Sequence, residues 1–171
     1  TKSGKAVETA GDIDVLLLDK TGTITIGNRK ATNFYPTKGI SLDDFIKSAV
    51  LSSLADDTPE GKSILELSEM LDVKSDVKAS FLQTTSDISH TIKFTAESRT
   101  SGVVLKDGTN IRKGAQDAAK NIAAQAGNNF PEDTAQKVID ISTNGGTPLV
   151  VIKNNQVQGV IELQDIIKPG M

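Results

Sequence analysis

The chain has 171 residues, of which 37% are hydrophobic and 24% charged, as in a folded globular protein. Its formal net charge of -3 argues against a nucleic-acid partner, because proteins that bind duplexes usually carry a basic face. It contains no cysteine, which excludes disulfide bonds and thiolate metal sites. No run of apolar residues approaches the roughly 18 to 20 that a membrane-spanning helix needs.

Neither end of the sequence resembles the natural end of a protein. Thr1 stands where a start methionine would, and no signal-peptide pattern follows it. Met171 comes shortly after a well-patterned strand. We therefore expect an excised piece of a larger protein.

The first predicted element is a strand over residues 15–18. This continuous apolar run is typical of a strand buried on both faces of a parallel sheet. It ends at Asp19, and a glycine turn over residues 21–23 follows. Since ligands gather at the carboxyl ends of strands in open parallel sheets, Asp19 is well placed for chemistry.

Two helices are predicted next. Ser41 with Asp44 forms a capping pattern before an apolar helical face. Thr58 and Pro59 supply the N-cap and the first helical position of the second helix.

The second half of the chain predicts two β-hairpins separated by two helices. The first hairpin covers residues 100–113 with its turn at 106–108, and the second covers residues 149–163. The helices between them are expected over residues 115–126 and from Pro131 to Ile141. This order predicts an α+β fold, in which helices flank an antiparallel sheet.

Residues 19–25, Asp-Lys-Thr-Gly-Thr-Ile-Thr, indicate phosphoryl transfer. A carboxylate such as that of Asp19 can attack a phosphoryl group and form an acyl phosphate. The adjacent lysine, the amides of the glycine turn and a divalent cation would offset the negative charge. Phosphatases with an aspartate nucleophile usually carry a second aspartate two residues later. Thr21 occupies that position here, so the acyl phosphate is expected to persist.

Residues 19–25 resemble the phosphorylation motif of the P-type ATPases, a family built on the haloacid-dehalogenase fold. Further stretches are similar to one branch, the ATP-binding subunits of Kdp-type potassium-transporting ATPases; they cover residues 11–18, 27–29, 53–61 and 94–102. The resemblance implies a P-domain that carries Asp19 and an N-domain inserted after it. We expect P-domain remnants over residues 1–27 and 157–171, and the nucleotide-binding N-domain over residues 28–156.

The resemblance also implies a set of ATP-binding residues. The residue types fit this role, since the ring of Phe94 can stack on adenine, the first-turn Glu60 can contact the nucleotide rim, and Lys113 can lie along the purine or meet a phosphate. Gly114 would let the backbone approach the ligand. The full set is Asp56, Glu60, Phe94, Thr95, Ala96, Glu97, Ser98, Arg99, Thr100, Ser101 and Lys113.

Each of the three singled-out residues has a structural alternative. Phe94 suits a hydrophobic core, Glu60 suits a helix cap, and Lys113 suits a solvated hairpin position. If Lys113 contacts the nucleotide, replacing it is expected to lower the affinity with little loss of stability, whereas a large loss would indicate a structural role.

The resemblance further implies a cytoplasmic domain of a plasma-membrane protein that imports potassium together with other subunits, and that uses ATP and Mg2+. The sequence lacks the Gly-Asp-Gly motif that completes the magnesium site and the Thr-Gly-Glu actuator loop. We therefore expect the chain to bind nucleotide, to hold no complete metal site and not to turn ATP over. His90 is assigned no function.

Two other functions remain open. One is an autonomous phosphatase of the same superfold, which Thr21 disfavours. The other is a non-catalytic interaction module in which residues 19–25 are vestigial.

Overall fold

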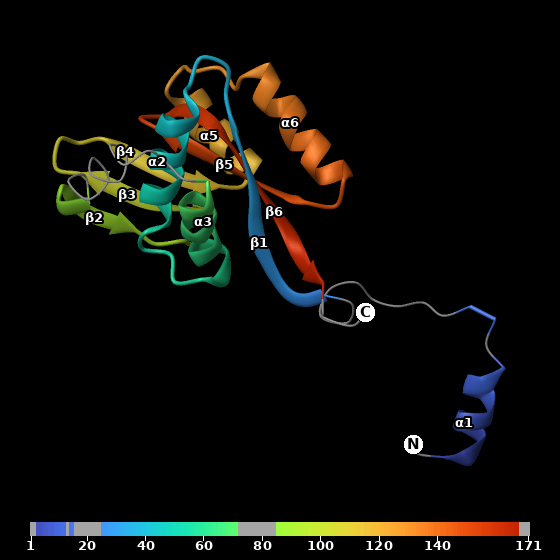
Figure 1. Ribbon diagram of the computed structural model, residues 1–171. Coiled ribbons are helices and arrows are strands. Elements are labelled where there is room, and N and C mark those ends of the chain that lie inside the picture. The colour runs from blue at the N-terminus through green and yellow to red at the C-terminus, as the bar shows by residue number, and fades with distance from the viewer. Residues whose placement is uncertain (1–2, 13, 16–24, 72–84, 168–171) are drawn as a thin grey trace.

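The computed structural model describes residues 3–12, 14–15, 25–71 and 85–167. Figure 1 shows α1 apart from the other elements, which pack around one sheet. The helices are α1 (Gly4–Gly11), α2 (Leu42–Ser53), α3 (Pro59–Met70), α5 (Gln116–Gln125) and α6 (Glu132–Thr143). The strands are β1 (Thr25–Pro36), β2 (Ile88–Ile92), β3 (Thr100–Leu105), β4 (Asn110–Gly114), β5 (Thr147–Lys153) and β6 (Gln156–Ile167).

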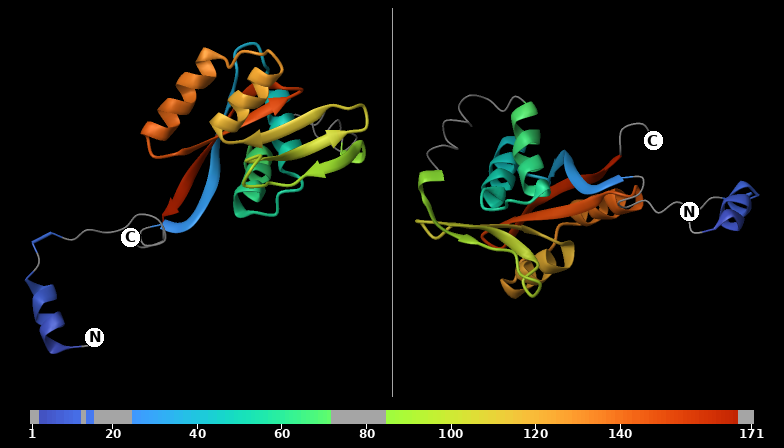
Figure 2. Two further views of the ribbon diagram at one scale, coloured as in Figure 1. Left: turned by 180° about the vertical axis from the view of Figure 1, so that it is seen from behind. Right: turned by 90° about the horizontal axis from the view of Figure 1, so that it is seen from below.

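The strands form a single antiparallel sheet in the order β1-β6-β5-β4-β3-β2. Helices α2 and α3 cover one face, and α5 and α6 cover the other (Figure 2). Val151 of β5 belongs to the first hydrophobic core and its neighbour Val150 to the second. Because both faces are covered, β5 is apolar without alternation. The predicted α+β fold is confirmed.

The predicted helix caps are also present. The Ser41 hydroxyl accepts a hydrogen bond from the Asp44 amide at 3.1 Å, and the Thr58 hydroxyl accepts one from the Gly61 amide at 3.1 Å. Both caps satisfy amide groups that would otherwise lack a partner at a helix start.

Strands β1 and β2 were not predicted from the sequence. β1 is an edge strand in which polar residues dominate, and its pairing with β6 is interrupted by register shifts. Such shifts interrupt the period-two alternation by which a strand is read from sequence. β2 is the opposite edge strand and has only five residues.

β1 and β6 run side by side from Pro36↔Gly159 to Thr25↔Ile167 (Figure 1). Side chains join them as well, because the buried Glu162 accepts hydrogen bonds from Asn33 and Tyr35, each at 3.0 Å. Burial raises the pKa of Glu162, but hydrogen bonds from Gln164, Asn33 and Tyr35 outweigh it and hold the pKa below its usual value.

The expected domain boundaries, after residues 27 and 156, fall within β1 and at the start of β6. The division into P-domain and N-domain therefore stays a prediction. Asp19 and most of the strand expected over residues 15–18 lie outside the described residues. Within the described ranges, no helix has the length and apolar character needed to cross a membrane.

Candidate functional site

Three separate segments of the chain meet at one end of the sheet. β2 ends at Ile92, which lies opposite Gly102 near the start of β3. Ser101 of β3 lies opposite Lys113 at the end of β4. The loop between α2 and α3 reaches the same place, since Asp56 contacts Lys113. Most of the predicted ATP-binding residues lie on these segments.

Lys113 and Asp56 form an ion pair that is largely withdrawn from solvent. Their side chains are 4% and 14% exposed. Lys113 is buried because it lies two residues after Ile111 on β4, and residues two apart on a strand share a face. Ile111 is in the core under α2 and α3, so Lys113 also faces these helices.

Asp56 is further held by the start of α3. Its Oδ1 atom accepts hydrogen bonds from the Thr58 hydroxyl at 2.6 Å and from the Thr58 amide at 3.1 Å. Burial raises the pKa of Asp56, but hydrogen bonds from Lys113 and Thr58, with the lysine's charge, outweigh it and lower the pKa below 3.8. The carboxylate is therefore ionised at neutral pH.

The interpretation of Lys113 as a solvated hairpin residue is wrong, because its side chain is buried in an ion pair. The same burial favours a structural role over the small stability effect expected for a residue that only contacts the nucleotide. Removing its charge would leave the carboxylate of Asp56 in a poorly solvated place without its cation, which is strongly destabilising. Lys113 therefore has a structural contact in addition to any ligand that it meets.

Glu60 lies in the first turn of α3 and is half-buried. The cap of this helix is the Thr58 hydroxyl. Within the described part of the chain, the Glu60 carboxylate has no hydrogen-bond or ion-pair partner. It is thus able to accept a hydrogen bond from a ligand.

Phe94 lies in the loop between β2 and β3 and is 64% exposed. The hydrophobic-core alternative for Phe94 is therefore wrong. An exposed aromatic ring at the edge of a sheet offers a face on which a planar base can stack.

The predicted ATP-binding residues 99–101 do not all lie on one face of the sheet. Ser101 alternates with Val103 and therefore shares the α2/α3 face with Lys113. Thr100 points to the other face and is fully buried. Arg99 pairs with Asp117 in the first turn of α5, the helix that covers this second face. Arg99 and Thr100 are thus not brought together with Lys113. Ala96 and Glu97 lie at the exposed tip of the loop.

Two glycines are required by close approaches within the protein. A Cβ atom on Gly114 would collide with the Arg99 carbonyl and lie 2.7 Å from Thr100 Cγ2. Gly114 thus allows β3 to pack closely against β4. The sequence had instead suggested that this glycine lets the backbone approach a ligand. On Gly61, a Cβ atom would lie 2.6 Å from Asp56 Cγ. Thr58 and Gly61 were missed as site residues, although their capping pattern was visible in the sequence.

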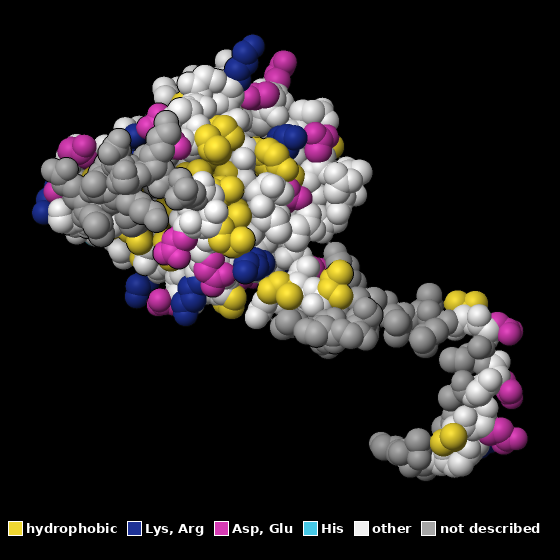
Figure 3. Space-filling model, viewed as in Figure 1, with side chains coloured by type: hydrophobic (Ala, Val, Ile, Leu, Met, Phe, Trp, Pro, Cys, Tyr) yellow, Lys and Arg dark blue, Asp and Glu magenta, His cyan; other side chains and the backbone are white. Residues whose placement is uncertain are grey.

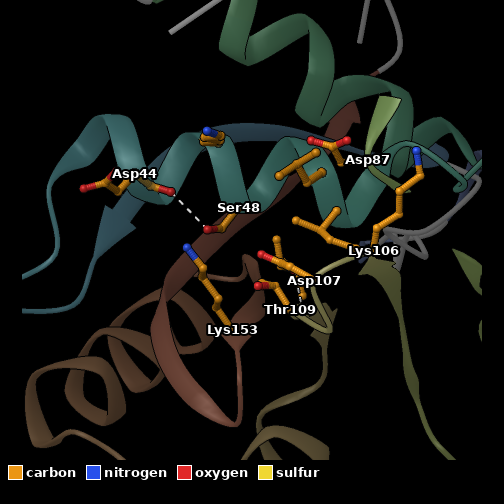
Figure 4. A pocket seen from close by; sticks show the side chains of 11 residues that line it. Asp44, Ser48, Asp87, Lys106, Asp107, Thr109 and Lys153 are labelled. Atoms are coloured by element: carbon orange, nitrogen blue, oxygen red, sulfur yellow. Dashed lines mark hydrogen bonds between the residues drawn. The ribbon is translucent and has the colours of Figure 1, made fainter. Parts of the chain in front are cut away.

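A separate pocket of 520 Å³ lies at the opposite end of β4 (Figure 4). Its apolar floor is formed by Leu51, Leu105 and Ile111, and charged groups of both signs surround it, among them Lys153 and Asp107. The described residues that line it include none of the predicted ATP-binding residues. Within the described ranges, no group of three or more His, Asp or Glu side chains is arranged to hold a metal ion.

No family model matches the sequence. The chain is 51% identical over 170 residues to the potassium-transporting ATPase ATP-binding subunit of Deinococcus radiodurans. It is 49% identical over 172 residues to that of Caldanaerobacter subterraneus subsp. tengcongensis. Each comparison covers 99% of this chain and 24% of the relative. Over nearly its whole length the chain is thus similar to one part of the ATP-binding subunits of potassium-transporting ATPases. It spans about a quarter of the length of these relatives.

Solved structures of P-type ATPases share the fold of this segment. A zinc-transporting PIB-type ATPase superposes with a TM-score of 0.62 at 19% identity, over 88% of this chain and 21% of the other. The catalytic domain of the CPx-ATPase CopB-B gives 0.54 at 16% identity, over 99% of this chain and 50% of the other. The resemblance stated from the sequence is confirmed.

Proposed function

We propose that the chain binds ATP at the end of the sheet where β2, β3, β4 and the start of α3 meet. One observation carries this proposal. Phe94 exposes its ring at the same end of the sheet as the buried Lys113–Asp56 pair. The ring supplies a stacking surface for adenine, worth roughly 1 to 3 kcal/mol per base. The free carboxylate of Glu60 is suited to accept a hydrogen bond from the exocyclic amine of the base.

In this proposal Lys113 does not hold the phosphates. Its ammonium group is paired with Asp56 and its side chain is 4% exposed. Lys113 therefore lies beneath the proposed site and, paired with Asp56, joins the end of β4 to the start of α3. On the face drawn in Figure 3, acidic and basic side chains are interspersed, and no broad basic patch is visible. The pairing of the Lys113 ammonium group with Asp56 supports recognition through the base rather than through phosphate charge.

The activity of the whole protein is a further part of the proposal. By the resemblance of residues 19–25, Asp19 would accept the γ-phosphoryl group, with Mg2+ offsetting the charge, and the aspartyl phosphate would drive potassium import. The other subunits of the potassium-transporting complex would be partners, and this segment would lie on the cytoplasmic side of the plasma membrane. The names of the relatives support this reading.

A titration of ATP, ADP and adenosine followed residue by residue by NMR tests the binding proposal. Shifts are expected in Phe94, Ser101 and Lys113, with similar affinities for the three compounds. Affinity that falls steeply as phosphates are removed would contradict recognition through the base. Unmoved resonances throughout this region would favour the interaction module.

The autonomous phosphatase is tested separately. The chain is expected not to hydrolyse a small phosphate ester in the presence of Mg2+, because Thr21 cannot act as the general acid. Measurable hydrolysis that is lost in Asp19→Asn would establish the phosphatase instead.

A further inference from the structure

The turn that follows Phe94 is held by hydrogen bonds among its own residues. The Thr95 hydroxyl donates to Ser98 Oγ at 2.8 Å and accepts from the Ser98 amide at 3.0 Å. The Thr95 carbonyl accepts from the Arg99 amide at 2.8 Å. Ser98 Oγ in turn donates to the Thr100 carbonyl at 3.3 Å, at the start of β3.

These contacts use the donor capacity of both hydroxyls. A serine or threonine hydroxyl carries one proton and two acceptor lone pairs. The proton of Thr95 is committed to Ser98, and that of Ser98 is committed to Thr100. Neither hydroxyl is free to donate to a ring nitrogen or a phosphate oxygen unless the turn opens. This contrasts with Glu60, whose carboxylate is free in the described part of the chain.

The turn restrains Phe94 from one side and the sheet restrains it from the other. Ile92 is paired with Gly102, and only Lys93 and Phe94 lie between it and Thr95. A fixed exposed ring binds a base more tightly than a mobile one, because less conformational freedom is lost on binding.

We propose that Thr95 and Ser98 are positioning residues, which hold the ring of Phe94 through a hydrogen-bonded turn and do not contact the nucleotide. The inference rests on the proposed ATP site and changes the role that the sequence resemblance gave to these two residues. Its distinguishing consequence is that the hydroxyls matter only while the ring is present.

The test is a double-mutant cycle on the 171-residue chain, with ATP affinity measured for Phe94→Ala, Thr95→Val and the double variant. Thr95→Val is expected to weaken ATP binding about two- to tenfold, the range for one or two lost hydrogen bonds. In the Phe94→Ala background the same change is expected to have no further effect. Thr95→Ser keeps the hydroxyl and is expected to restore the affinity.

Amide hydrogen exchange gives a second readout that does not depend on nucleotide. The amides of Ser98 and Arg99 should exchange faster in Thr95→Val and at the normal rate in Thr95→Ser, while amides of β4 and β5 remain unchanged. Faster exchange in β4 and β5 would mean a general loss of folding, and the positioning role would be rejected.

The remaining outcomes are distinct. If Thr95→Val weakens binding equally with and without Phe94, the hydroxyl contacts the nucleotide itself and the inference is wrong. If Thr95→Val has no effect on affinity in either background, the turn does not position the ring. If the unaltered chain binds no ATP, the proposed function is overturned and this inference with it.

Discussion

The ammonium group of Lys113 is ion-paired with the carboxylate of Asp56, 57 residues earlier in the chain, and this contact joins β4 to the start of α3. The pair is charged and largely buried, so each partner depends on the other to offset the loss of hydration. It connects the stability of the sheet end to the proposed ATP site.

Lys113→Met is expected to destabilise the fold by about 3 kcal/mol, because it leaves Asp56 without its cation in a poorly solvated place. Unfolding in urea at neutral pH measures this change. Adding Asp56→Asn to Lys113→Met should recover part of the loss, since no buried charge is then left unpaired. A loss of only a few tenths of a kcal/mol for Lys113→Met would contradict the burial of the pair.

The effect of Lys113→Met is expected to depend on pH. The pKa of Asp56 in the folded protein lies below its ordinary value of 3.8. Its contribution to stability is therefore fully present above pH 3.8 and is lost as the pH falls through the lower folded pKa. In Lys113→Met, burial raises the pKa of Asp56 without opposition from the lysine. The gap in stability between the unaltered chain and the variant should shrink from pH 7 to pH 3; a constant gap would exclude Asp56 as its source.

Phe94→Ala is expected to weaken ATP and ADP binding by a similar amount, in the range of about 1 to 3 kcal/mol for stacking on one base. Because the ring is 64% exposed, thermal stability should be nearly unchanged. Ile139→Ala is a matched control, since Ile139 is 54% exposed on α6 and lies outside the site. Isothermal titration of both variants decides the matter. Equal binding by Phe94→Ala and the unaltered chain would remove Phe94 from the site.

Gly61→Ala is expected to weaken both stability and ATP binding. Replacing a helical glycine by alanine ordinarily stabilises a helix by roughly 0.5 to 1 kcal/mol. At Gly61 the new Cβ would lie 2.5 Å from the Asp56 carbonyl oxygen and 2.6 Å from Asp56 Cγ, so both the backbone and the carboxylate of Asp56 must move from their positions beside Lys113. Gly4→Ala in α1 is the control, because its Cβ would meet no atom within 4 Å. Stabilisation by both changes would show that Asp56 shifts without cost.

Asp19→Asn is expected to leave the ATP affinity of this chain almost unchanged, since Asp19 is expected to lie in a different domain from Phe94. In the whole pump the same change should abolish the phosphoenzyme and transport, because the nucleophile is lost. Incubation of the chain with labelled ATP and Mg2+ should give little labelled protein. Stoichiometric labelling of Asp19 would overturn the expected domain assignment.

The sequence predicted those elements whose pattern is local. The capping residues Ser41 and Thr58 correctly predicted where α2 and α3 begin. The turn at residues 106–108 correctly predicted the hairpin of β3 and β4. β1 and β2 were missed because both are edge strands, which are stabilised mainly by pairing with a neighbouring strand. Their own residues show little alternation of apolar and polar side chains.

The candidate site shows the same division. The roles of Phe94 and Glu60 in nucleotide binding were suggested by residue type and by the resemblance, and they stay predictions. The burial of Lys113 was not suggested, because it depends on Asp56 arriving from another loop. Nor did the sequence reveal that Arg99 turns to the opposite face of the sheet to meet Asp117.

The pairing of Thr25 with Ile167 means that the chain enters and leaves the sheet at neighbouring points. Any pull or twist arriving from outside this unit would reach it through β1 and β6 together. Hydrogen bonds along the two strands, reinforced by Glu162, would resist such a load in parallel. The proposed ATP site lies toward β2, at the edge of the sheet opposite β1, so such a load would enter the sheet at the side away from the proposed nucleotide contacts.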